Sequence, residues 1–234
     1  MDKTVETYRR QAAERAVDLV ESGMVVGLGH GNTALFAVRR VAELLSRGDL
    51  NDVIGVPCSR SVAAEAERLG IPLTDLENHP VVDVTIDGAD EVDPNLNLIK
   101  GGGGALLREK IVAQATEREV IVVDEAKLSP MLGTQRPVPI EVVPFGWRPE
   151  LEFLSSLGAE ADLRLWKYDT PFESDQGNLI LDANFGPIDD LYALAALLNA
   201  RASIVGHGLF LGLASVVVVA GSEGVRVLRV EEGV

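Results

Sequence analysis

Residues 24–46 read MVVGLGHGNTALFAVRRVAELLS, and they decide how the chain is expected to fold. The apolar run at 24–28 is typical of a buried parallel strand, and helical periodicity follows over 32–46. The same alternation continues to residue 125, with further apolar runs and helical patterns at 53–56, 59–69, 81–86, 105–116 and 119–123. It predicts an α/β fold with a Rossmann-like open, mainly parallel sheet and helices on both faces.

The pattern changes near Gln135, where a proline-rich stretch begins. Beyond it, helical patterns alternate with strand patterns in a way typical of an α+β domain, at 149–157, 164–168, 178–182, 188–199 and 202–205. We therefore expect a smaller inserted α+β domain at 136–207, while 1–135 and 208–234 form the Rossmann-like catalytic domain. The tail predicts two strands joined by a turn at 222–224.

The amino-acid composition limits the classes of protein to which this chain can belong. The chain has 234 residues, 47% of them hydrophobic and 24% charged, as in ordinary globular proteins. A net charge of −15 argues against nucleic acid or an anionic membrane as a partner. No apolar run approaches the roughly 18 residues of a membrane span, and the first residues indicate an amphipathic helix without a secretory region. The single cysteine, Cys58, excludes an internal disulfide and favours a cytoplasmic location.

The loop Gly27-Leu-Gly-His-Gly-Asn-Thr33 joins a predicted strand to a predicted helix. Glycines let the backbone approach a ligand closely, and the N–H groups at a helix start favour an anion. Asn32 and Thr33 add side-chain donors. The spacing matches neither G-x-G-x-x-G nor a P-loop. The alternative is a tight turn in which Asn32 caps the helix.

A second loop, Asp87-Gly-Ala-Asp-Glu-Val-Asp93, allows three interpretations. It is a solvated turn, a metal site whose spacing does not match an EF-hand, or a catalytic loop whose paired carboxylates push their pKa values apart. Its position after a buried strand favours the catalytic loop. The three histidines, His30, His79 and His207, lack metal-ligand spacing, so no metal ligand is predicted.

A third segment, KGGGGALLREK at 100–110, follows in the same strand and helix unit. Consecutive glycine amides can hold a carbonyl or enolate oxygen, with charge added by Lys100, although a flexible linker is the alternative. Glu109 is predicted in the second turn of the helix, on one face with Leu106 and Ala113. It is either a base or an ion-pair partner of a neighbouring arginine.

An acidic loop constrains how an anionic substrate can bind. The carboxylates of Asp87 and Asp90 repel a phosphate dianion, so the phosphate of a phosphorylated substrate must lie away from them. Residues 29–33 and Lys127 would then hold the phosphate, and the acids would face the far carbons.

Together these segments resemble the type A ribose-5-phosphate isomerase family. The resemblance rests on VGLGHGNTA (26–34), DGADEVD (87–93), KGGGGALLREK (100–110), VVDEAKLSPMLG (122–133), GNLILD (177–182) and GHGLF (206–210). It implies interconversion of D-ribose 5-phosphate and D-ribulose 5-phosphate in the pentose phosphate pathway, without a metal or other cofactor. It also implies a small-molecule pentose phosphate as partner and assembly as a homodimer or homotetramer.

The resemblance further implies roles for individual residues. Glu109 would move a proton between C2 and C1 through an enediolate, assisted by Asp87, Asp90 and Lys100 as the other catalytic residues. The implied substrate-binding residues are His30, Gly31, Asn32, Thr33, Asp87, Gly88, Ala89, Asp90, Lys100, Gly101, Gly102, Gly103 and Lys127. The phosphate loop departs from the usual G-T-G-S-T, because Gly-His-Gly-Asn-Thr stands at 29–33.

Two other classes of function stay open on the sequence. One is a related enzyme, a sugar-phosphate deaminase or a CoA transferase. The other is a non-catalytic sugar-phosphate sensor, which should carry a basic helix-turn-helix segment of the kind that this acidic chain does not show.

Overall fold

The computed structural model describes residues 3–229, which form two compact units. The first unit comprises 3–89, 108–128 and 212–229, and the second comprises 90–107 and 129–211. The chain therefore passes between the units at four points, one of them inside helix α4 (Leu106–Gln114). Each unit has its own sheet and its own buried core.

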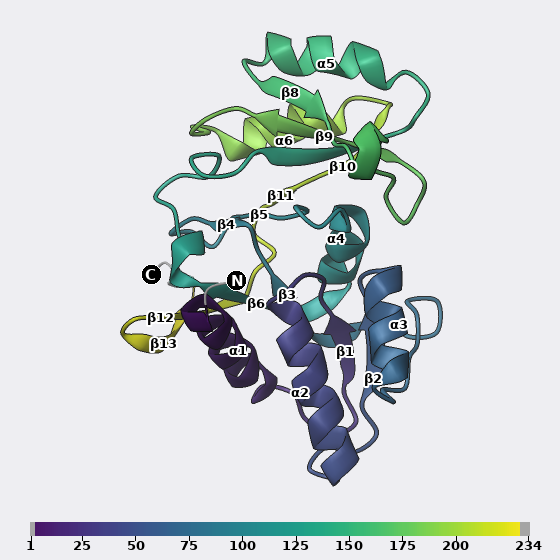
Figure 1. Cartoon of the computed structure of the whole chain (residues 1–234), viewed down its shortest axis with the longest axis vertical. Helices are drawn as coiled ribbons and strands as arrows, with labels where there is room; N and C mark the ends of the chain where they lie inside the picture. Colours follow the sequence, from purple (N-terminus) through teal and green to yellow (C-terminus); the bar gives the residue numbers. More distant parts are fainter. Residues whose placement is uncertain (1–2, 230–234) are drawn as a thin grey trace. The chain divides into compact units, whose positions relative to one another are not determined.

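The first unit is built on a six-stranded sheet in the order β13-β12-β6-β3-β1-β2 (Figure 1). Five of its strands are parallel, and β13 pairs antiparallel with β12 at one edge. This confirms the predicted open, mainly parallel sheet and the two-stranded tail. The strands are β1 (Val25–Leu28), β2 (Ile54–Pro57), β3 (Val82–Gly88), β6 (Thr116–Asp124), β12 (Val216–Gly221) and β13 (Gly224–Arg229).

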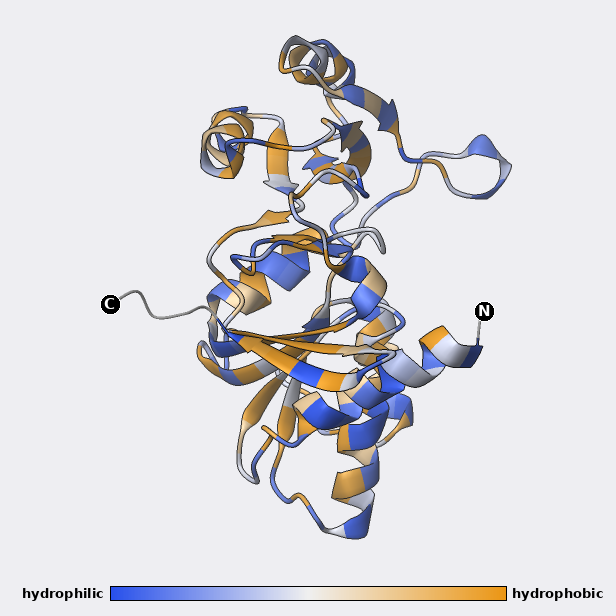
Figure 2. Ribbon diagram, turned by 90° about the vertical axis from the view of Figure 1, so that its left-hand side faces the viewer, coloured by the Kyte–Doolittle hydropathy of each residue, from blue (hydrophilic) through white to orange (hydrophobic). Residues whose placement is uncertain are grey.

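Helices cover both faces of this sheet, as predicted. Alternate residues of a strand point to opposite faces, so Val26 packs on one side and Val25 on the other. The first face packs against buried side chains of three helices, α1 (Lys3–Val17), α2 (Ala34–Arg47) and α3 (Arg60–Arg68). The second face packs against Val112 of α4. Figure 2 shows the strands as mainly hydrophobic, which is typical of a sheet covered on both sides.

The second unit contains an antiparallel sheet in the order β10-β7-β9-β8, with the two helices α5 (Trp147–Ser156) and α6 (Leu191–Asn199) packed in its core. This agrees with the predicted α+β pattern. A second, three-stranded sheet has the order β11-β5-β4. The strands of the unit are β4 (Glu91–Val92), β5 (Leu98–Ile99), β7 (Val138–Val142), β8 (Glu160–Leu163), β9 (Leu179–Asn184), β10 (Ile204–His207) and β11 (Leu209–Phe210).

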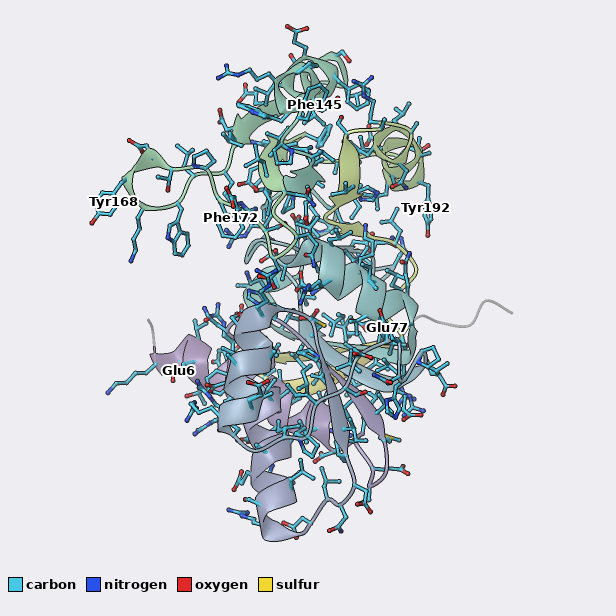
Figure 3. All side chains as sticks on the ribbon, turned by 90° about the vertical axis from the view of Figure 1, so that its right-hand side faces the viewer. Glu6, Glu77, Phe145, Tyr168, Phe172 and Tyr192 are labelled. Atoms are coloured by element: carbon cyan, nitrogen blue, oxygen red, sulfur yellow. The ribbon has the colours of Figure 1, made fainter. Side chains whose placement is uncertain are left out.

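The strand predicted at 164–168 is wrong. Strand β8 ends at Leu163, and the one-turn 3-10 helix η2 (Lys167–Asp169) follows in a loop. Tyr168 has a left-handed φ of 60° and is 96% exposed, and Figure 3 shows its side chain pointing away from the ribbon. Trp166 is also exposed in this loop, and Leu165 forms only an isolated bridge with Pro171.

The compact units differ from the predicted domain bounds of 136–207 and of 1–135 with 208–234. Residues 90–107 belong to the second unit because β5 pairs with both β4 and β11. Residues 129–135 join it too, and the Ser129 N–H donates to the Val92 carbonyl at 2.9 Å. The division into domains stays a prediction. Within residues 3–229 no helix is long and apolar enough to cross a membrane.

Candidate active site

In the first unit, several predicted site residues follow neighbouring parallel strands. Residues 30–33 come after β1, Asp87 and Gly88 end β3, and Lys127 lies in the 3-10 helix η1 (Glu125–Lys127) after β6. Because these strands are parallel neighbours, their carboxyl ends lie at one edge of the sheet. The order β6-β3-β1 therefore gathers the three segments at that edge.

Asp87 joins two of these segments. Its side chain is fully buried, and its Oδ1 accepts the backbone N–H of His30 at 2.9 Å and that of Gly88 at 2.7 Å. The loop after β1 approaches so closely that a Cβ on Gly29 would lie 2.5 Å from the same oxygen. A solvated turn is therefore the wrong interpretation of Asp87, since its carboxylate is part of the packed interior.

The glycine loop leads into α2 without a side-chain cap. Thr33 is the N-cap and makes no capping hydrogen bond, so the alternative in which Asn32 caps the helix is wrong. Gly31 has a φ of 103°, which favours glycine, and Asn32 is exposed. A helix start without a capping side chain presents backbone N–H groups and a positive dipole to an anion.

Ser59 is a residue of this edge that the sequence analysis did not identify. Its Oγ shares a hydrogen bond with His30 Nδ1 at 2.9 Å and also accepts the Val62 N–H at the start of α3. The bond fixes the imidazole of His30 in the glycine loop after β1. The signal in the sequence was its position directly after β2, the neighbour of β1.

Glu109 lies in the first turn of α4 and is only 4% exposed. The prediction of the second turn was wrong, because the helix begins at Leu106 and not before it. The predicted shared face is confirmed, since Leu106 and Ala113 are buried as well. Glutamate is among the residues least often buried in proteins, so the buried Glu109 is a candidate for a chemical role. Burial also lowers the pKa of the next residue, Lys110, to about 7.

In the second unit, the register of β4 and β5 brings Asp90 next to Lys100. Glu91 pairs with Ile99, and the Asp90 N–H donates to the Ile99 carbonyl at 2.8 Å. Lys100 is 1% exposed, and its ammonium lies 5.4 Å from the centre of the Phe210 ring, within range of a cation–π interaction. A lysine this deeply buried is rare in proteins unless it has a partner or a function.

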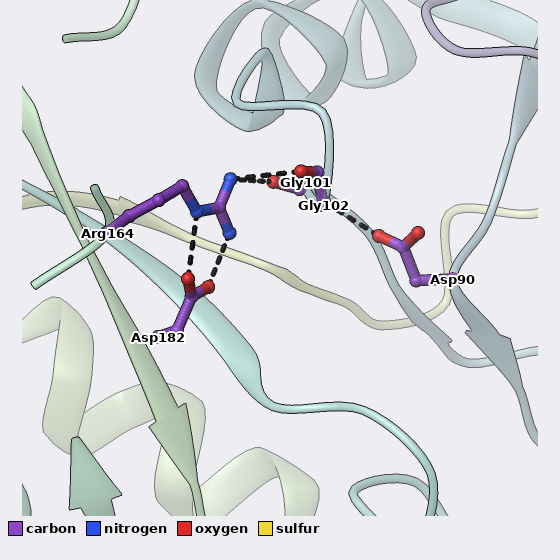
Figure 4. Close-up of polar contacts among 5 residues, drawn as sticks. All are labelled: Asp90, Gly101, Gly102, Arg164 and Asp182. Atoms are coloured by element: carbon purple, nitrogen blue, oxygen red, sulfur yellow. Dashed lines mark hydrogen bonds and ion pairs between the residues drawn. The ribbon is translucent and has the colours of Figure 1, made fainter. Parts of the chain in front are cut away.

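The glycine segment after Lys100 is held by hydrogen bonds, which a flexible linker is not. The Gly102 N–H donates to Asp90 Oδ2 at 2.7 Å, and the carbonyls of Gly101 and Gly102 accept from Arg164 at 2.9 and 3.1 Å (Figure 4). A Cβ on Gly102 would lie 2.9 Å from Asp90 Oδ1, so a larger residue there would push against the Asp90 carboxylate. Arg164 is a second residue that the sequence analysis missed.

The other two acids of the loop have structural roles. Glu91 is fully buried and accepts the backbone N–H groups of Gly133, Gln135 and Arg136. Asp93 accepts the N–H groups of Asn95 and Asn97 and shapes the turn between β4 and β5. In the described part of the chain, no group of three or more His, Cys, Asp or Glu side chains could hold a metal ion.

The predicted site residues thus fall into two sets, each described within its own unit. The first set is His30, Gly31, Asn32, Thr33, Asp87, Gly88, Ala89, Glu109 and Lys127, and the second is Asp90, Lys100, Gly101, Gly102 and Gly103. Each set combines carboxylates with a cation and with backbone amides. Such a combination suits proton transfer on an anionic substrate.

Comparison with known proteins identifies the family. The family model described as ribose 5-phosphate isomerase A (phosphoriboisomerase A) matches residues 54–224. The chain is 58% identical to "Ribose-5-phosphate isomerase A" of Chloroflexus aurantiacus, over 95% of this chain and 93% of that protein. The chain is also similar to solved structures of known proteins.

One solved structure is a D-ribose-5-phosphate isomerase in complex with phospho-erythronic acid. It has a TM-score of 0.94 and 41% identity, over 96% of this chain and 99% of that one. The other is the ribose 5-phosphate isomerase of Plasmodium falciparum, with a TM-score of 0.93 and 38% identity, over 97% and 99% of the two chains. These findings do not favour a sensor, a deaminase or a CoA transferase. The chain belongs to the ribose 5-phosphate isomerase A family.

Proposed function

We propose that this chain interconverts D-ribose 5-phosphate and D-ribulose 5-phosphate, with Glu109 as the base that moves the proton. The observation that carries the proposal is family membership over nearly the whole length, in a chain that keeps the acids, the lysines and the glycine segment of the motifs. A related isomerase binds phospho-erythronic acid, a phosphorylated sugar acid. A ligand with a phosphate and a carboxylate suits a site divided between anion-binding amides and a reacting centre.

The phosphate is held by residues 30–33 and by Lys127. The uncapped start of α2 supplies backbone N–H groups, and Lys127 at the same edge of the sheet adds a positive charge. Asp87 Oδ1 accepts two backbone N–H groups beside this loop, and repulsion between the carboxylate and the dianion favours the amide side for the phosphate. When the phosphate binds at this end, the sugar carbons lie toward the carboxylates of Asp87 and Asp90.

The chemical step is a proton transfer between neighbouring carbons. The Glu109 carboxylate removes the proton from C2 of the open-chain aldose, and the electron pair of that C–H bond forms the C1–C2 double bond while the C1 oxygen takes up the carbonyl electron pair, which gives an enediolate. Glu109 then returns its proton to C1, and the proton on O2 passes to O1, so that C1 carries a hydroxyl and C2 becomes the ketone carbon. The low exposure of Glu109 supports this role, since it limits exchange of the transferred proton with water.

The second set of residues stabilises the substrate oxygen on which negative charge develops. Lys100 supplies positive charge, and the amides of Gly101 and Gly103 supply donors, for the oxygen that becomes negative in the transition state, while Gly102 holds the segment through its bond to Asp90. Asp87 and Asp90 accept bonds from the sugar hydroxyls beside the Gly88 and Ala89 backbone, and one of the two aspartates assists ring opening.

The proposal includes a cytoplasmic homodimer or homotetramer that needs no cofactor. The chain has a single cysteine, Cys58, which is buried, and a sequence that uses no internal disulfide suits a reducing compartment. Light scattering on the purified chain measures the assembly, and a monomeric mass would contradict the oligomer.

The decisive experiment measures ribulose 5-phosphate formed from ribose 5-phosphate, with and without a chelator. Wild type should turn over equally in both, and should release no ammonia from glucosamine 6-phosphate. Glu109→Gln removes the base and should lower kcat by at least about 10²-fold. The matched control is Glu67→Gln, the same chemical change at an exposed position of α3, which should leave kcat unchanged.

Two results would contradict the proposal. If wild type forms no ribulose 5-phosphate, the assigned reaction is wrong. If Glu109→Gln keeps near-normal kcat while circular dichroism shows an intact fold, the reaction stands but the base is another residue.

A further inference from the structure

Arg164 binds the glycine segment from the side opposite Asp90. Its Nη1 donates to the carbonyls of Gly101 and Gly102 at 2.9 and 3.1 Å, and the other edge of its guanidinium forms a bidentate pair with Asp182. Figure 4 shows the guanidinium between the two partners. All five residues of this network belong to the second unit, and the arginine lies some sixty residues from the glycines in sequence.

The guanidinium is held in place before any substrate binds. The Arg164 N–H donates to the Ile180 carbonyl at 2.8 Å, and the Arg164 carbonyl accepts the Phe172 N–H at 2.9 Å. Its side chain is 14% exposed, and its guanidinium carbon lies 5.8 Å from the centre of the Phe172 ring. A planar group fixed by a bidentate carboxylate keeps one orientation, which a lysine ammonium would not.

The peptide groups of the segment transmit that orientation. A trans peptide is planar, with its C=O and N–H pointing in opposite directions. The Gly101–Gly102 peptide is held at both ends, by Arg164 at its oxygen and by Asp90 at its N–H. In the next peptide Arg164 holds the Gly102 oxygen, so the N–H of exposed Gly103 must point away from the arginine.

We propose that Arg164, fixed by Asp182, is a positioning residue that sets the direction of the glycine amides, above all the Gly103 N–H, toward the substrate oxygen at C1 or C2. This inference rests on the proposed function of the glycine segment. The positive charge of Arg164 also polarises the Gly101–Gly102 and Gly102–Gly103 peptides, which strengthens their N–H groups as donors. Arg164 itself touches no reacting atom, so its effect passes through the backbone.

The test is Arg164→Met, with Arg201→Met as the matched control. Arg201 forms the same kind of bidentate pair in the same unit, with Glu150 at 2.8 and 2.9 Å, and its guanidinium carbon lies 4.5 Å from the centre of the Phe153 ring. Arg164→Met should lower kcat for ribose 5-phosphate by about 10- to 100-fold, since loss of one oxyanion donor costs about 10²–10³. KM should change by less than about threefold, because the lost contact matters most in the transition state.

Inhibitors distinguish positioning from general damage. Inorganic phosphate probes the anion loop alone, so its inhibition constant should be equal in wild type and Arg164→Met. Phospho-erythronic acid also probes the carboxylate end, and its inhibition constant should rise about as much as kcat falls. Arg164→Lys keeps the positive charge but loses the planar guanidinium that binds several oxygens at once. Its kcat should lie between those of wild type and Arg164→Met.

Several outcomes would overturn the inference. These are a kcat within twofold of wild type in Arg164→Met, an equal loss in Arg201→Met, or a loss confined to KM. If Arg164→Met does not fold, Arg164→Lys decides, and a wild-type kcat there would overturn it. Failure of wild type to isomerise ribose 5-phosphate would instead reject the proposed function, before any variant is compared.

Discussion

Gly29 and Asp87 place a buried carboxylate against a loop with no room for a side chain. A Cβ at Gly29 would lie 2.4 Å from the Ile86 carbonyl oxygen and 2.5 Å from Asp87 Cα. Both contacts are with backbone, which cannot move aside cheaply. We therefore expect Gly29→Ala to lower the free energy of unfolding by about 1–3 kcal/mol, the usual cost of overpacking.

The matched control for that prediction is Gly88→Ala. A Cβ there would meet no atom nearer than 3.8 Å, so the free energy of unfolding should change by less than about 1 kcal/mol. Urea denaturation followed by circular dichroism measures both variants. Equal free energies of unfolding for Gly29→Ala and Gly88→Ala would contradict the prediction. They would show that the loop after β1 moves away from β3 despite the hydrogen bond from the His30 N–H to Asp87.

Lys127 tests the phosphate end of the proposal. It is half-buried in η1, next to Asp124, which caps that turn by accepting the Ala126 N–H. A phosphate is held equally in the ground state and the transition state, so Lys127→Ala should raise KM by about tenfold or more and change kcat by less than about threefold. Steady-state kinetics with ribose 5-phosphate measures this. A fall in kcat at unchanged KM would place Lys127 at the reacting carbons instead.

At this scale the sequence indicated candidate residues better than their contacts. Lys100 was singled out because it precedes four glycines, and Glu109 because it shares a helix face with apolar residues, and both are buried in the structure. Ser59 and Arg164 were missed because their partners are 29 and 63 residues away. An arginine bound to carbonyls leaves no pattern in the sequence, since any glycine segment offers the same oxygens.

Helix α4 carries two unusual groups in one turn, and the second sets a pH dependence. Burial lowers the pKa of Lys110 to about 7, against an ordinary value of 10.5. Between these values the unfolded chain binds a proton that the folded chain does not. Stability must then rise with pH from about 7 to about 10.5, by up to about 1.4 kcal/mol per pH unit, and stay level below 7.

Lys110→Met should remove this rise. Urea unfolding at pH 7.5, 8.5 and 9.5 measures the free energy of wild type and variant, and their difference should change by about 2–3 kcal/mol across the range. Lys3→Met, at an exposed position of α1, is the control and should follow wild type. Parallel profiles of wild type and Lys110→Met would mean that the ammonium stays charged in the folded chain.

Helices and strands could be predicted where several consecutive residues lie in the same environment, for example a sheet covered on both faces. The strands β1, β3 and β6 were located within a few residues, because each contains a run of buried residues in a sheet that is covered on both faces. The strands β4, β5 and β11 were missed, since two residues are too few to show a period. Strand β8 was predicted at 164–168 but lies at Glu160–Leu163, and part of the predicted range forms an exposed loop.

The division into units could not be deduced from composition alone. The change near Gln135 marks a real change from parallel to antiparallel sheet. It does not show that 90–107 joins the second unit, because that follows from the pairing of β5 with β11, more than a hundred residues away. Such long-range pairing depends on the whole chain, and no local pattern records it.

The net charge of −15 predicts how salt affects the whole molecule. Like charges repel one another in the compact state, and this repulsion reaches about 30 Å at 0.01 M salt but only about 8 Å at 0.15 M. Salt also screens the ion pairs on the helices, for example Arg15 with Asp18 and Arg68 with Glu65. Those pairs are exposed, and each contributes only about 0–1 kcal/mol.

Relief of repulsion should therefore exceed the loss of ion pairs. Raising NaCl from 10 to 150 mM at pH 8 should stabilise the chain by about 1 kcal/mol, or about 2–4 °C in Tm. Thermal unfolding at fixed protein concentration measures it, which keeps any subunit association constant. Choline chloride is the control, and an equal rise there indicates screening and not sodium binding. A Tm that falls with salt would mean that the surface ion pairs act as a cooperative network strong enough to outweigh the excess of carboxylates.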